Sequence, residues 1–160
     1  MKEYAGFMKS LFIVFCFAFC FIAAAPVMAG FNETMDVILE QDSLTYGAAS
    51  FLILSGAGVL DDGATLEESA LRMGELAPKV VLASDEPVTL GQYSYMIMTV
   101  YSIKGGIFYS LFKNPHYSLR ELRFQNIVQG KAYPRMTLSG ERAVRILSRV
   151  ISVQEPADEE

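Results

Sequence analysis

Five basic side chains near the C-terminal end of the chain are the residues best suited to binding chemistry: Lys131, Arg135, Arg142, Arg145 and Arg149. The last three are spaced by three and four residues, so a helix would carry them as one stripe. A guanidinium donates two parallel hydrogen bonds to a carboxylate or a phosphate. The cluster predicts a site for an anionic ligand, and a solvated helix face without a ligand is the alternative.

Charge is unevenly distributed along the chain, which has a formal net charge of −5. Residues 30–112 carry eleven acidic and three basic side chains, whereas residues 113–149 carry eight basic and two acidic ones. Such asymmetry permits a basic face for an anionic polymer or lipid surface. Ion pairing between the two halves would explain it equally well.

Other residue types that do chemistry have simpler explanations. His116, the only histidine, lies in a turn without a second His or a Cys to complete a metal site. The paired carboxylates at residues 67–68 and 85–86 fit a helix start and an exposed joint. Four tyrosines could stack on sugars, but their apolar setting favours a core position: Tyr93, Tyr95, Tyr101 and Tyr109. We therefore expect no enzyme, no metal and no cofactor.

Residues 1–29 have the pattern of a secretory signal peptide. Lys2 and Lys9 precede an apolar run over residues 11–25, and small side chains end at Ala29. We expect cleavage there and export to the periplasm or cell surface, with membrane contact through the signal peptide only. Two alternatives stay open. The segment could remain uncleaved as an N-terminal membrane anchor, or the protein could be lipidated at Cys20.

The elements that must position these residues are predicted to be helices, so the fold class is all-α. Ser or Thr followed three residues later by Glu or Gln forms capping boxes at Thr65, Thr89 and Ser118. The predicted helices cover residues 31–41, 45–54, 65–76, 89–103, 118–130 and 137–151. Residues 30–152 form one domain, and residues 153–160 form a disordered acidic tail.

Three of these helices are led by a threonine after an apolar residue, at Thr45, Thr89 and Thr137. The intervals of 44 and 48 residues indicate about three helical-hairpin repeats joined by short extended segments. A single hairpin cannot bury its own apolar face, so stacking or circular closure must supply the core. The third repeat lacks its second helix, and we predict that residues 32–41 pack near the last helix instead.

Residues 117–146 resemble the S-layer homology repeat, an envelope-anchoring module. Residues 127–130 look like the turn of that repeat, Tyr133-Pro134 like its strand, and Thr137 sits at the threonine of its Thr-Arg-Ala-Glu motif. Leu138 stands where the family has its arginine. The resemblance implies binding to pyruvylated cell-wall polysaccharide.

The expected function is a non-enzymatic module that attaches to an anionic cell-wall polymer. Contact with another envelope protein is the alternative, and a hydrolase acting on envelope material, using Glu67 or Glu121, is a distant third. No nucleic acid is expected as a partner.

Overall fold

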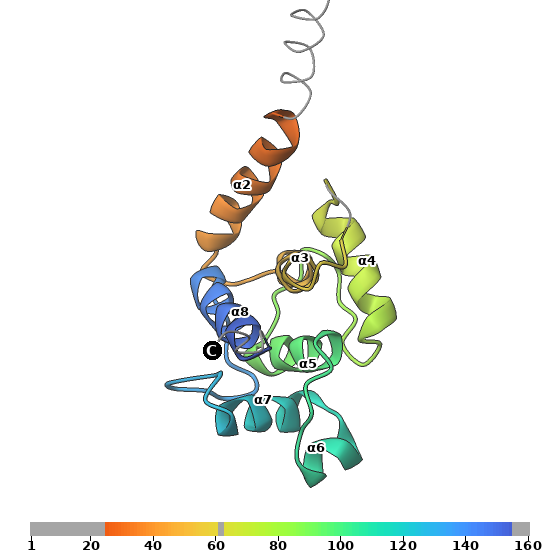
Figure 1. The fold of residues 1–160 in the computed structure, drawn as a ribbon, viewed down its shortest axis with the longest axis vertical. Coiled ribbons are helices and arrows are strands. Elements are labelled where there is room, and N and C mark those ends of the chain that lie inside the picture. The colour runs from red at the N-terminus through yellow and green to blue at the C-terminus, as the bar shows by residue number, and fades with distance from the viewer. Residues whose placement is uncertain (1–24, 61–62, 155–160) are drawn as a thin grey trace, which may run out of the picture. The chain divides into compact units, whose positions relative to one another are not determined.

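The computed structural model describes residues 25–60 and 63–154 of the chain, with side chains from residue 31 onward. These residues form seven helices and no strand (Figure 1). They are α2 (Ala25–Leu39), α3 (Tyr46–Gly56), α4 (Leu66–Leu76), α5 (Leu90–Val100), α6 (Ile107–Phe112), α7 (Pro115–Phe124) and α8 (Gly140–Gln154). The prediction of an all-α fold is confirmed.

The chain divides into two compact units, Met1–Met35 and Asp36–Glu160. In the first unit the described residues belong to α2, which begins six residues before the helix predicted at 31–41. The predicted cleavage point after Ala29 therefore falls inside α2. No helix in the described part of the chain is long and apolar enough to cross a bilayer. Residues 1–24, with Cys16 and Cys20, and residues 155–160 lie outside the described residues. The first two residues of the predicted tail, Val153 and Gln154, belong to α8.

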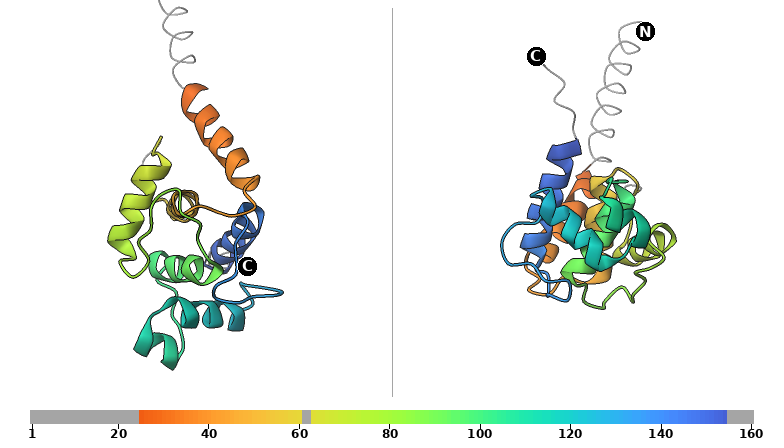
Figure 2. Two further views of the ribbon diagram at one scale, coloured as in Figure 1. Left: turned by 180° about the vertical axis from the view of Figure 1, so that it is seen from behind. Right: turned by 90° about the horizontal axis from the view of Figure 1, so that it is seen from below.

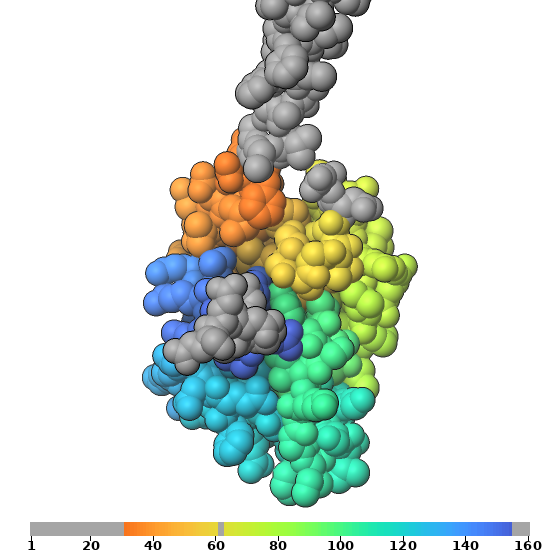
Figure 3. All heavy atoms as spheres, viewed as in Figure 1, coloured from red at the N-terminus to blue at the C-terminus, as the bar shows by residue number. Residues whose placement is uncertain are grey.

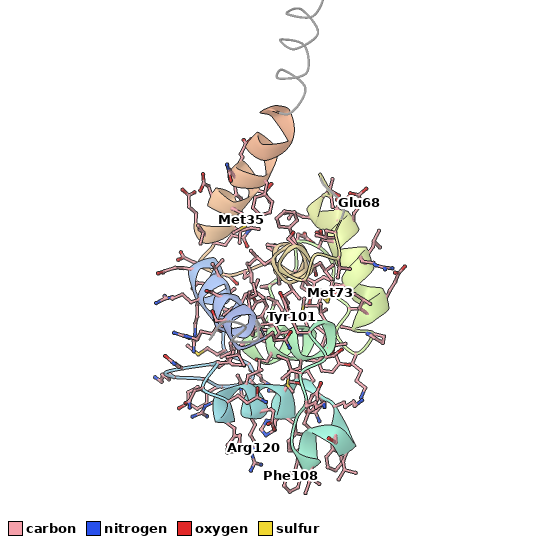
Figure 4. All side chains as sticks on the ribbon, viewed as in Figure 1. Met35, Glu68, Met73, Tyr101, Phe108 and Arg120 are labelled. Atoms are coloured by element: carbon pink, nitrogen blue, oxygen red, sulfur yellow. The ribbon has the colours of Figure 1, made fainter. Side chains whose placement is uncertain are left out.

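Two helical hairpins, the short helix α6 inserted between α5 and α7, and the final helix α8 build most of the second unit. Helix α4 packs on α3, and α7 packs on α5, while α8 packs on α3 (Figures 1 and 2). Every residue of α3 from Tyr46 to Leu54 is buried, as its lack of charge predicts. Figure 4 shows Met73 pointing from α4 toward α3, and the side chain of Met73 is fully buried.

Main-chain hydrogen bonds between the joints close the three repeats into a ring. The Leu44 N–H donates to the Leu138 carbonyl over 2.7 Å, and the Val88 N–H donates to the Leu44 carbonyl over 2.9 Å. All three side chains are buried. Isolated antiparallel bridges pair Thr45 with Pro87 and Thr89 with Thr137. Circular closure, one of the two arrangements expected for such repeats, is what the second unit adopts.

The third repeat starts two residues later than the sequence analysis predicted. Thr137 does not lead the last helix, because it is extended and paired with Thr89. Helix α8 begins at Gly140, and Leu138 is the buried residue that matches Leu44 and Val88. The corrected intervals between equivalent residues are therefore 44 and 50.

Glycines permit the close approach of each helix start to a neighbouring joint. A Cβ on Gly91 would lie 2.8 Å from the Pro134 carbonyl oxygen, and a Cβ on Gly140 would overlap the Ile38 carbonyl. The Gly140 N–H also donates to the Gln41 carbonyl over 2.9 Å. Residues 38–41 therefore pack against the start of the last helix, as predicted for this part of the segment.

Local capping signals were right at two helices and wrong at a third. Thr65 with Glu68 and Thr89 with Gln92 form complete capping boxes. Ser118 does not cap α7: the helix begins one turn earlier at Pro115, and the Asn114 side chain accepts from the Tyr117 N–H over 3.0 Å. Proline suits the first helical position because its missing N–H would be unpaired there anyway.

Candidate functional site

Arg142, from the predicted basic cluster, binds the chain's own backbone. Its guanidinium donates to the Lys131 carbonyl over 2.6 Å and to the Gln129 carbonyl over 3.3 Å. Burial lowers the pKa of Arg142, and the neighbouring charge of Arg145 lowers it further. Arg142 thus ties the loop before α8 to the helix, which leaves few of its N–H groups for a ligand.

Arg149, about two turns after Arg142 on α8, has a similar role, because its guanidinium donates to the Ile127 carbonyl over 3.2 Å. Arg145 pairs with Glu141 over 3.1 Å, and both side chains are exposed. The side chains of Lys131 and Arg135 are exposed, and neither side chain makes a hydrogen bond or ion pair to a described residue. In the predicted cluster, Arg142 and Arg149 therefore hold the preceding loop, and Arg145 forms a surface ion pair. The side chains of Lys131 and Arg135 remain free cations.

A hollow with a volume of about 640 Å³ lies between the end of α5, the loop after it and α6. Its rim carries Lys104 and Lys113, both exposed, with the exposed hydroxyls of Ser102 and Ser110. Polar and charged side chains of this kind donate hydrogen bonds to carboxylate, phosphate and sugar oxygens. The hollow therefore has the chemistry of an anion-binding surface.

Two tyrosines form the floor of the hollow, where Tyr95 and Tyr109 are both buried. Burial raises the pKa of Tyr109, as does the neighbouring Tyr95, while a hydrogen bond with Thr99 lowers it. The Thr99 hydroxyl in turn donates to the Tyr95 carbonyl over 2.8 Å. These contacts fix the floor, so a ligand would meet a surface that is already in place.

Helix boundaries explain why the chain forms a hollow here. Helix α5 ends at Val100, and Ser102 follows with a φ of 51°. The chain then runs through Gly105 and Gly106 into α6, and Lys113 ends α6 with a φ of 33°. Two sharp changes of direction thus bring Lys104 and Lys113 to the same rim.

The remaining predicted candidates lie apart from the hollow and from one another. His116 is exposed and meets the ring of Tyr117 edge-on, with 5.3 Å between ring centroids. Glu68 caps α4 at the opposite end of the second unit (Figure 4). Tyr93 is fully buried, as its apolar setting predicted. Among the described residues, no group of three or more His, Cys, Asp or Glu side chains could hold a metal ion.

Lys104 and Lys113 were missed because neither belongs to a recognisable motif. The available signal was indirect: Lys104 precedes a Gly-Gly pair and Lys113 precedes Asn-Pro, so both flank short breaks in helical structure. They line the same hollow because of how the chain turns between α5 and α6 and how α6 then packs on α7. No protein-family model, curated protein or solved structure matches this chain.

Proposed function

We propose that this chain is a non-enzymatic module for envelope association that binds an anionic saccharide polymer in the hollow between α5 and α6. The observation that carries the proposal is the composition of the hollow: Lys104 and Lys113 on the rim, hydroxyls beside them, and Tyr95 and Tyr109 beneath. Cations would pair with the acidic groups of the polymer, and the hydroxyls would bond its sugar oxygens.

The closed ring supports the resemblance to the S-layer homology repeat. Equivalent buried residues, Leu44, Val88 and Leu138, meet through main-chain hydrogen bonds, as expected of a repeat that cannot bury its own face. The ligand chemistry of that family does not transfer residue by residue. In the corrected register the family's arginine falls at the first residue of each Thr-led or Ser-led helix, which here is Tyr46, Leu90 or Gly140. All three are buried and none is a cation, so a ligand would need cations from elsewhere, and the hollow has two.

Retention on purified cell wall tests the proposal. The wild-type chain should be retained at low salt and released at high salt, because exposed cations are screened by salt. Replacing both Lys104→Ala and Lys113→Ala should reduce retention at least tenfold. This pair is exposed, so folding should survive, and circular dichroism with thermal melting would verify that.

The matched control replaces Lys131→Ala and Arg135→Ala, which removes the same charge from the two free cations of the predicted cluster. Retention of this control should stay within about twofold of the wild type. If the control loses retention and the hollow variant does not, the polymer binds beside α8 and the hollow is the wrong site. No retention of the wild type at any salt would contradict polymer binding and leave contact with another envelope protein.

A further inference from the structure

Helix α6 exposes a continuous apolar face that the proposed polymer site does not use. Ile107 and Leu111 are 78% and 70% exposed, and Phe108 and Phe112 are more than half exposed. These positions, at i, i+1, i+4 and i+5, share one side of a helix. We define them as the α6 face. Large apolar side chains gathered in this way mark an interaction surface.

Aromatic stacking holds the α6 face in place. The ring of Tyr117 stacks against the rings of both Phe108 and Phe112, with centroid distances of 6.0 and 5.4 Å. Tyr109, on the opposite side of α6, is buried and anchors the helix. The Glu121 carboxylate accepts from the Gly106 N–H over 3.0 Å at the start of the helix. The face is therefore a fixed part of the fold.

Cations surround the α6 face. The Arg120 guanidinium lies 5.6 Å from the centre of the Phe108 ring, and Figure 4 shows both side chains at the lower end of the second unit. The Lys79 ammonium donates to the carbonyls of Phe112 and Lys113. Over residues 104–124 the only acidic side chain is Glu121, which is bonded to Gly106 and Gln125. The apolar face thus has a basic rim in an acidic protein.

We propose that the α6 face docks on the surface of an anionic phospholipid bilayer. Apolar side chains would enter the acyl boundary while the surrounding lysines and arginines pair with lipid phosphates, the arrangement used by helices that lie in a membrane surface. In Figure 3 the surface of α6 forms the lower edge of the second unit beside α7, where a flat surface can reach it. This contact is additional to the one expected of the N-terminal segment.

Charge and composition argue against the other occupants. A second copy of the chain would bring two basic rims together, and like charges repel. The C-terminal residues 155–160 (Glu-Pro-Ala-Asp-Glu-Glu) have complementary charge but no large apolar side chain to cover Ile107 or Leu111. An anionic bilayer supplies both the negative charge and the apolar volume.

Tryptophan fluorescence tests the proposal cleanly, because the chain contains no tryptophan. Phe108→Trp would be made in the full-length chain and mixed with vesicles of phosphatidylcholine, with or without phosphatidylglycerol. We expect a blue shift of the emission and protection from acrylamide with the anionic vesicles. Leu111→Trp should behave in the same way, and it keeps the test valid should Phe108→Trp disturb the stacking.

Leu71→Trp is the control, since Leu71 is 74% exposed on α4, away from α6. Its emission should not change, even if the N-terminal segment holds the protein on the vesicle. Reversing the charge of the two cations beside the α6 face with Lys79→Glu and Arg120→Glu in the Phe108→Trp chain should abolish the shift.

Three results would overturn the proposal. The first is unchanged emission of both α6 tryptophans with anionic vesicles, and the second is an equal shift of Leu71→Trp. The third is a shift that grows with protein concentration without vesicles, which would show that a second copy covers the face. None of these bears on retention by cell wall, so failure here is distinguishable from failure of polymer binding.

Discussion

The phenol of Tyr93 donates a 3.0 Å hydrogen bond to the main-chain carbonyl of Ala143, which joins α5 to α8 inside the core. Tyr93 is fully buried, and burial raises its pKa far above the ordinary value, so it stays protonated. Tyr101 (labelled in Figure 4) lies near enough to raise the pKa of Tyr93 further, and its buried hydroxyl has no hydrogen-bond partner among the described residues. Loss of the hydroxyl is therefore expected to change the free energy of unfolding in opposite directions at the two tyrosines.

Tyr93→Phe should lower the free energy of unfolding by about 1 kcal/mol, the usual net value of a buried hydrogen bond. Tyr101→Phe should raise it by a similar amount, because it removes a buried hydroxyl that gains nothing. Urea unfolding of both variants beside the wild type measures the two shifts. Equal destabilisation by both would mean that the Tyr101 hydroxyl is bonded in solution.

Gly140→Ala should destabilise the second unit by at least about 2 kcal/mol, since the new methyl group overlaps the Ile38 carbonyl and must push the helix start away. Gly74→Ala is the matched control within α4, where a Cβ would make ordinary contacts of 3.7 Å with Val81. It should stabilise by about 0.5 to 1 kcal/mol through helix propensity. If both variants shift the melting temperature in the same direction, the close contact between Gly140 and the Ile38 carbonyl is contradicted.

Arg142→Ala should loosen the loop before α8, because the carbonyls of Gln129 and Lys131 lose their guanidinium partner. We expect a loss of about 1 kcal/mol and faster hydrogen exchange at the amides of Ile127 and Val128. Lys131→Ala, which removes an exposed side chain, should change stability by less than about 0.5 kcal/mol. If Arg142→Ala lowers cell-wall retention and leaves amide exchange unchanged, Arg142 binds the ligand and does not hold the loop.

The cap formed by Glu68 should make the stability of the protein depend on pH. Its carboxylate accepts from the Thr65 N–H and hydroxyl, and these bonds hold its pKa below the ordinary value of 4.5. A lowered pKa in the folded state stabilises the protein above pH 4.5, and that contribution is lost as the pH falls through the lowered pKa. Thermal melts of the wild type and Glu68→Gln should therefore differ at neutral pH and converge in acid. A constant difference would show that the charge of Glu68 does not stabilise the cap.

Local patterns predicted most of the fold because their physics is local. The capping boxes at Thr65 and Thr89 need only four consecutive residues, and both form. Where two capping signals lay close together, the sequence analysis chose the wrong helix start. At α7 the Asn114-Pro115 start prevailed over the Ser118 box, and the Ser118 hydroxyl donates instead to the Asn114 carbonyl over 2.8 Å.

Contacts between distant residues were harder to predict. Thr137 looked like a helix start until its pairing with Thr89, in another repeat, fixed it as extended chain. The sequence analysis predicted an anionic ligand for the arginines of the C-terminal cluster. In the structure Arg142 and Arg149 donate to backbone carbonyls, which no sequence pattern marks. The hollow depends in the same way on the turns between α5 and α6 and on the packing of α6 on α7.

The bond between Leu44 and Leu138 has a consequence for biosynthesis. It joins residues roughly ninety positions apart, and contacts of such long range slow folding. The second unit therefore cannot complete its core until the last helix has been synthesised, and until then the buried sides of Leu44 and Val88 face solvent. Any chain terminated before Gly140 is expected to aggregate or be degraded, so the final helix sets the moment at which the newly made protein becomes stable.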